Sequence, residues 1–140
     1  ANNIAREKEF VINLVDDALA DRMNICAVDL PPEESEIDAA GLTIAASSMV
    51  GPGRIVESPI ALECREVQTL KFSPRRNIVL GEVLCVHVRE GLVDPQTLNV
   101  DIDNYEPLGR LFASLYSRQS TRFSMPRMSL EEWRDRAGTD

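Results

Sequence analysis

Side chains that commonly carry out catalysis or bind metals are sparse in this sequence. The only histidine, His87, follows Cys85 by two positions, and the three cysteines Cys26, Cys64 and Cys85 form no C-x-x-C pair. Such spacings match neither a zinc site nor a disulfide framework. Cys64 and Cys85 both lie in apolar runs, which is typical of small buried side chains. No metal site is therefore predicted.

Motifs for nucleophilic catalysis and for dinucleotide binding are not found either. A catalytic triad would have to use His87, yet no serine stands in a G-x-S-x-G turn, and His87 shares a strand face with Val83 and Cys85. This pattern favours a structural histidine. The segment Gly51-Pro52-Gly53 lacks the third glycine and the strand-to-helix context of a Rossmann fingerprint.

Adjacent like charges in the chain have structural explanations. The pairs Glu33-Glu34 and Glu131-Glu132 stand at predicted helix starts, where the helix dipole favours acidic side chains. Arg75-Arg76 falls in a predicted turn, where an exposed basic pair serves solubility more often than anion binding. Composition and spacing alone thus predict a domain of mixed helices and strands without a defined chemistry.

The apolar pattern predicts a sequence of short helices and longer strands. Acidic residues at 16 and 17 begin the second helix, Gly41 is a candidate C′ residue after the third, and Ser129 with Glu132 forms a capping box. Residues 42–50 read as a short strand or extended loop, residues 91–105 as irregular, and residues 111–116 as strand or helical turn. The predicted helices span residues 2–9, 16–27, 33–40 and 129–137, and the strands residues 10–14, 59–72 and 78–88.

The two longest strands are expected to form an antiparallel pair. In the first, Ile60, Leu62, Cys64, Leu70 and Phe72 share one phase of a period-2 pattern, which predicts a dry face. The other phase, residues 63, 65, 69 and 71, is polar and predicts a wet face. The second strand is apolar on both phases near its middle, as a strand covered on both sides would be.

Composition limits the class of protein. A chain of 140 residues with 44% hydrophobic and 27% charged residues fits one folded domain. Its net charge of −8 opposes binding to nucleic acid and to anionic membranes. No apolar run is long enough for a membrane helix, and the polar start shows no signal peptide, so a cytoplasmic location is expected.

Ordered sequence blocks resemble the flavin reductase-like family of FMN-binding split β-barrels. Each block is weak alone, but their joint order is specific, and together they cover most of residues 2–128. The fold class implied is mainly β with helices. The principal blocks are Glu9-Phe10-Val11-Ile12-Asn13-Leu14-Val15, Arg54-Ile55-Val56-Glu57-Ser58-Pro59, Val79-Leu80-Gly81-Glu82-Val83, Pro107-Leu108-Gly109-Arg110 and Tyr116-Ser117-Arg118.

The resemblance implies an oxidoreductase, usually a homodimer, that binds FMN and passes hydride from NAD(P)H to flavin. The cofactor supplies the chemistry, so no catalytic triad is expected. By position, the resemblance implies cofactor contacts at Asn3, near a phosphate seat, at His87, and at Arg110 and Tyr116 in the closing segment. A surface ion pair for Arg110 and core packing for Tyr116 are the alternatives.

Two departures from the family pattern leave alternatives open. The family's opening strands have no counterpart here, so residues 1–128 are expected to be the C-terminal portion of the domain, with residues 129–140 as a helix and tail. The rest of the barrel is expected to come from residues outside this sequence, either as the cleaved or remaining part of a longer chain or as a separate N-terminal fragment. Phe112-Ala113-Ser114 stands where relatives tend to have glycines, and bulk there would narrow or block the flavin edge. The alternative is a non-catalytic split-barrel module for ligand binding or dimerisation, and a flavoprotein with another substrate is a third reading.

Overall fold

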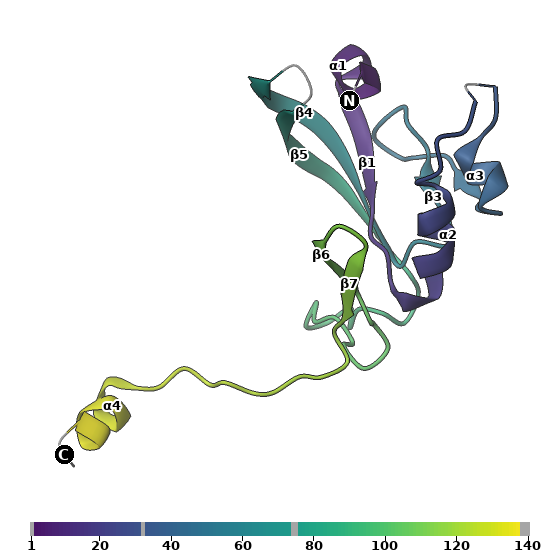
Figure 1. Ribbon diagram of the computed structural model, residues 1–140. Helices are drawn as coiled ribbons and strands as arrows, with labels where there is room; N and C mark the ends of the chain where they lie inside the picture. The colour runs from purple at the N-terminus through teal and green to yellow at the C-terminus, as the bar shows by residue number, and fades with distance from the viewer. Residues whose placement is uncertain (1, 32, 74–75, 138–140) are drawn as a thin grey trace.

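The main sheet of the protein has three antiparallel strands. A computed structural model describes residues 2–31, 33–73 and 76–137, and it orders the strands β1 (Glu9–Asn13), β4 (Ile60–Ser73) and β5 (Arg76–Val88) (Figure 1). The predicted long pair is confirmed as β4 and β5. Its predicted connecting turn contains Arg75, which lies outside the described residues.

One face of this sheet is covered by the segment that carries β2 (Ile44–Ala45) and β3 (Arg54–Ile55). Side chains from this face hold that segment through its backbone: Glu63 accepts from two N–H groups, Glu9 accepts from the Gly51 N–H, and Asn13 accepts from the Ile55 N–H. Glu9 and Asn13 are four positions apart in β1, and Glu63 in β4 is paired with Val11 midway between them. All three acceptors therefore point to the same side of the sheet.

The opposite face of the sheet is open and apolar. Ile12, Leu62 and Val86 lie side by side across β1, β4 and β5, and Ile12 and Val86 are 42% and 53% exposed. The predicted wet and dry faces hold only in part for β4: Cys64 is buried and Arg65 is exposed as predicted, but Glu63, expected in water, is 0% exposed, and Phe72, expected to be buried, is largely exposed. The physical reason is that the β2–β3 segment covers the polar phase, and register shifts interrupt the alternation further along β4.

The second long strand departs from expectation in the same way. Leu80 and Val83 in β5 are both exposed, so the predicted cover on both sides is wrong among the described residues. Apolar side chains on both faces of a strand indicate only that both faces can be packed against. It does not show which element of the same chain supplies them.

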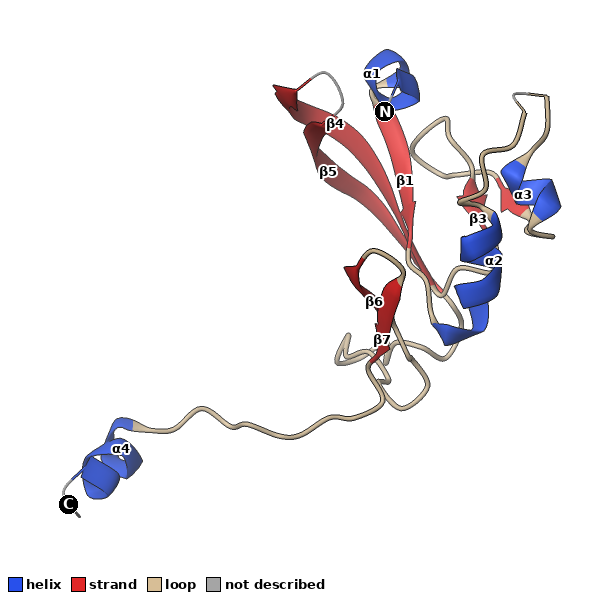
Figure 2. Cartoon of the chain, viewed as in Figure 1, coloured by secondary structure: helices blue, strands red, loops and turns tan. Residues whose placement is uncertain are grey.

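Short helices flank the sheet where the sequence predicted them (Figure 2). They are α1 (Asn2–Glu7), the 3₁₀ turn η1 (Asp17–Leu19) continuing into α2 (Ala20–Ile25), and α3 (Glu36–Ala39). Gly41 follows α3 with a φ of 63°, which confirms its predicted place after the helix. Pro32, in the expected break before α3, lies outside the described residues. The described part of the chain contains no helix long and apolar enough to span a membrane.

A second hairpin follows an irregular stretch. Residues 91–105 contain no strand longer than the isolated Val93–Val100 bridge, as predicted. The chain then forms β6 (Leu108–Phe112) and β7 (Leu115–Arg118), which pair antiparallel. The residues predicted as strand or helical turn are thus parts of two strands and their tight connection.

The last described segment runs away from the body of the protein. Residues 119–129 have no regular secondary structure and lead to α4 (Leu130–Ala137), which lies far from the sheet (Figure 1). The predicted capping box is confirmed, since Glu132 N–H donates to Ser129 Oγ at 3.2 Å and Ser129 N–H donates to Glu132 Oε2 at 2.6 Å.

Candidate functional site

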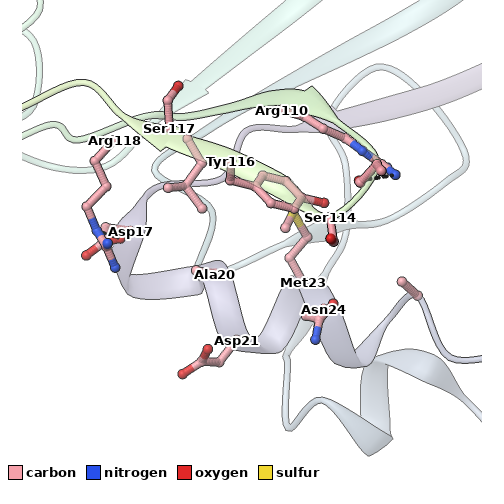
Figure 3. A pocket seen from close by; sticks show the side chains of 13 residues that line it. Asp17, Ala20, Asp21, Met23, Asn24, Arg110, Ser114, Tyr116, Ser117 and Arg118 are labelled. Atoms are coloured by element: carbon pink, nitrogen blue, oxygen red, sulfur yellow. Dashed lines mark hydrogen bonds and ion pairs between the residues drawn. The ribbon is translucent and has the colours of Figure 1, made fainter.

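A pocket of about 580 Å³ lies between the η1–α2 segment and the β6–β7 hairpin (Figure 3). This volume falls within the usual range for sites that bind small molecules. The helical wall contributes acidic and amide groups, and the hairpin wall contributes basic, hydroxyl and aromatic groups. The residues with functional side chains are Asp17, Asp21, Met23 and Asn24 on one wall, and Arg110, Ser114, Tyr116, Ser117 and Arg118 on the other.

Backbone hydrogen bonds hold the two walls in register. Asp17 N–H donates to the Glu106 carbonyl at 3.0 Å, and Leu108 N–H donates to the Val15 carbonyl at 3.1 Å. The Arg118 guanidinium also donates to Asp17 Oδ1 at 2.6 Å, which is an ion pair across the mouth of the pocket. These contacts of residues 15 and 17 with residues 106, 108 and 118 therefore fix the distance between the two walls.

Asp16 anchors the helical wall from beneath. Its Oδ1 accepts from the Leu19 N–H at 3.2 Å and caps η1, while its Oδ2 accepts from Arg89 Nη1 at 3.0 Å. Asp16 is buried, and Arg89, the residue that directly follows β5, reaches it from the end of the sheet. One carboxylate thus connects the main sheet to the element that forms half of the pocket.

Arg110 and Tyr116 are cross-strand partners that face the pocket. The Arg110 guanidinium carbon lies 5.8 Å from the centre of the Tyr116 ring, within the range of a cation–π contact. Arg110 Nη2 also donates to the Ala113 carbonyl at 3.2 Å. In Figure 3 the Tyr116 ring projects from the hairpin toward α2. A cation beside an aromatic plane suits a planar ligand that carries negative charge.

The structure brings together two of the four residues that the resemblance implied. Arg110 and Tyr116 line the pocket, whereas Asn3 lies exposed in α1 and His87 lies in β5. In Figure 1, α1 and the β6–β7 hairpin are at opposite ends of β1. Roles for Asn3 and His87 in cofactor binding stay predictions, and they would require contacts outside this pocket.

His87 belongs instead to a polar cluster around the buried Glu63 on the covered face of the sheet. His87 Nε2 contacts Glu63 Oε1, and Cys85 Sγ lies 3.7 Å from His87 Nε2. Glu63 also accepts from the Ser48 N–H at 2.7 Å and from the Met49 N–H at 2.6 Å. Burial alone would raise the pKa of Glu63, but hydrogen bonds from Ser48, His87 and Met49 together lower it from 4.5 to about 2.

This cluster serves to hold a loop. Glu63, Cys85 and His87 are residue types that can bind a metal, and their candidate ligand atoms lie within 4.8 Å of one another. However, both carboxylate oxygens already accept hydrogen bonds from the backbone of residues 48 and 49. The cluster therefore fixes the β2–β3 segment on the sheet, and the prediction that the chain binds no metal stays a prediction.

Of the segment Phe112-Ala113-Ser114, which was expected to narrow the flavin edge, the bulkiest residue does not line the pocket. Its side chain is 77% exposed, and Ala113 and Ser114 line the pocket in its place. The connection between β6 and β7 turns through Ala113, which has a φ of 50°. The expectation that this segment narrows the flavin edge stays a prediction, as does the alternative of a non-catalytic module.

Several pocket residues were missed by sequence reasoning. Asp17 and Asp21 were assigned only to a helix start or not singled out, and Ser114 was part of an undecided segment. Arg118 stood in a quoted block but was given no role. A signal was present in the order of the blocks. Tyr116 and Arg118 are two positions apart and therefore share one face of a strand, and Arg110 lies opposite Tyr116 on the preceding strand.

Comparison with known proteins places the chain in a family. The model of the flavin reductase like domain matches residues 1–109. An uncharacterized protein of Deinococcus radiodurans is 36% identical over 96% of this chain and 60% of its own length. The structure of Pseudomonas fluorescens 2-nitrobenzoate 2-nitroreductase NbaA is 34% identical, with a TM-score of 0.84 over 92% of this chain and 64% of that one.

A further solved structure has the same fold. Nitrilotriacetate monooxygenase component B from Bacillus cereus is 26% identical, with a TM-score of 0.79 over 89% of this chain and 63% of that chain. The chain thus spans less than two thirds of the length of these relatives. The family match covers the sheet, α2 and the start of β6, and the fold is that of flavin reductase split barrels. The chain belongs to the flavin reductase like domain family.

Proposed function

We propose that this chain is part of an oxidoreductase that binds FMN and passes hydride from NAD(P)H to flavin. The observation that supports it most directly is the pocket between α2 and the β6–β7 hairpin, where Arg110 and Tyr116 stand together. The family supports flavin chemistry in general, and two similar structures are named as a nitroreductase and a monooxygenase component.

The residues of the pocket fit one part of such a cofactor. The Arg110 guanidinium offers fixed N–H donors to an anionic or carbonyl group, and the Tyr116 ring offers a plane for stacking. Asp17 is occupied by Arg118, so it holds the wall in place and does not compete for Arg110. When bound, the flavin would accept the hydride, and the protein would position it and limit its contact with water.

The open face of the sheet supports a second part of the proposal. The chain spans 60% of the Deinococcus radiodurans relative, and the apolar side chains Ile12 and Val86, on either side of the half-buried Leu62, are exposed within the described residues. In the proposed enzyme, the remaining part of the split barrel packs on this face and completes the cofactor site, and two copies form a homodimer. An exposed apolar surface of this kind is typical of an interface.

The test is an FMN fluorescence-quenching titration of the wild type and of Arg110→Ala. Loss of the guanidinium is expected to weaken FMN binding about tenfold, or about 1.4 kcal/mol. The thermal midpoint should change little, because an exposed charge contributes little to stability. The matched control is Arg65→Ala, which removes an exposed arginine in β4 outside the pocket.

The outcomes separate the parts of the proposal. Equal FMN affinity in Arg110→Ala and in the control would refute the assignment of Arg110. Failure of the wild type to bind FMN, even after addition of the N-terminal part of a relative, would refute the flavin proposal itself. Binding without NAD(P)H oxidation would retain the cofactor but refute the hydride donor.

A further inference from the structure

The segment of residues 119–137, here called the arm, carries apolar side chains that are exposed among the described residues. Phe123 is 80% exposed and Trp133 is 57% exposed, and Met125 and Leu130 are similarly open. In Figure 1 the arm leaves β7 and extends away from the sheet before it forms α4. A run of exposed large apolar residues over one segment marks an interaction site more often than a solvated tail.

The helix at the end of the arm is too short to be stable alone. α4 has eight residues and none of them is buried, whereas an isolated helix of fewer than about 12–15 residues is marginal in water. Its capping box stabilises the first turn only. Leu130 and Trp133, three positions apart, lie on the same side of the helix and give it an apolar face. The helix therefore needs a surface on which to pack.

Charge indicates what that surface is. Residues 119–128 include Arg122 and Arg127 and no acidic residue, and the arm as a whole has four arginines against three acidic residues, whereas the whole chain has a net charge of −8. Arg122 already contacts Asp103 on its own body at 3.4 Å, so the start of the arm is attracted to an acidic surface. Beyond that point the arm extends away from its own body, and the acidic body of a second copy is a surface of the required charge.

We propose that the arm packs on a second copy of this chain, so that two copies exchange arms in a symmetric dimer. In a two-fold arrangement each arm covers the equivalent surface of the other copy, and both sets of apolar side chains are buried by one contact. Phe123, Leu130 and Trp133 are the anchors, and Arg122 and Arg127 align the arm on the acidic partner. This extends the homodimer of the proposed function, and it requires no flavin.

Trp133 is the only tryptophan of the chain, so its fluorescence reports on the arm alone. The emission of the full chain is measured across a dilution series together with sedimentation velocity. Dimerisation and a blue shift of Trp133 emission are expected to occur over the same concentration range. Emission typical of exposed tryptophan in the dimer would overturn the proposal, as would a wild type that remains monomeric. A blue shift at all concentrations would show packing within one chain and would also overturn it.

Variants then test which side chains hold the dimer. The double variant Phe123→Ser with Leu130→Ser keeps the fluorescent reporter and should weaken dimerisation about 100-fold or more, because two large apolar side chains lose their burial. The control Ile102→Ser removes an exposed apolar residue from the body and should leave the dimer intact. Unchanged dimerisation in the double variant would refute arm exchange. Both readouts are taken without flavin, so failure of FMN binding leaves this result unaffected.

Discussion

Removal of the Asp16 carboxylate is expected to loosen the helical wall of the pocket. In Asp16→Ala, η1 loses its cap, which is worth about 1 kcal/mol. The charge-assisted hydrogen bond from Arg89 is lost as well, at about 1.5 kcal/mol, the low end of the usual range, because Arg89 is only half-buried. The sum is a decrease of about 2.5 kcal/mol in the free energy of unfolding if the two effects add.

Asp16→Asn separates the two contributions, because an asparagine still caps a helix but carries no charge to attract Arg89. This variant should lose only the ion-pair part, about 1.5 kcal/mol. The assay is urea unfolding of both variants and the wild type, with the FMN titration repeated on each. A loss below about 0.5 kcal/mol in Asp16→Ala, the usual range for surface substitutions, would refute the anchoring role of Asp16. Equal losses in the two variants would refute the cap.

Two other substitutions test the covered face of the sheet, one of them as a function of pH. Because hydrogen bonds lower the pKa of Glu63 from 4.5 to about 2, ionised Glu63 contributes stability that is fully present above about pH 4.5 and is lost as the pH falls toward 2. Glu63→Gln should therefore flatten the acid limb of a plot of urea midpoint against pH, and an unchanged limb would contradict the assignment. Gly53→Ala would place a Cβ against Ile44 Cγ2 and 3.0 Å from the Ala45 carbonyl oxygen. The free energy of unfolding should therefore fall by about 1–3 kcal/mol in a thermal unfolding experiment. A neutral effect would show that β2 and β3 can separate freely.

Local signals were sufficient to predict most helices and strands of this chain. The period-2 pattern located β4 and β5, and Ser129 with Glu132 located α4, because each signal depends on residues close in sequence. The β6–β7 hairpin was not resolved as such, since its turn at Ala113 lacks the glycine or asparagine that usually marks a left-handed position. The blocks that resemble the family still led to Arg110 and Tyr116.

The burial of Glu63 could not be read from its neighbours in sequence. An acidic residue in the polar phase of a strand is normally in water, and the N–H groups that satisfy Glu63 come from residues 48 and 49, on a loop whose path the pattern did not define. The pocket presented the same difficulty. Asp17 and Arg118 are 101 positions apart and meet only because η1 and β6–β7 fold together.

The uneven pairing of β4 implies a gradient of local opening along one strand. From Ala61 to Arg65 it has hydrogen-bonded neighbours on both sides, whereas after Glu66 its only strand partner among the described residues is β5. A two-stranded ribbon is marginal by itself, so its tip should open and close while the base stays shut. Backbone amides near Leu70 should exchange with deuterium long before that of Cys64. Strand fraying is thus expected to proceed from the tip of the ribbon toward β1, and the base should be the last part of the sheet to unfold.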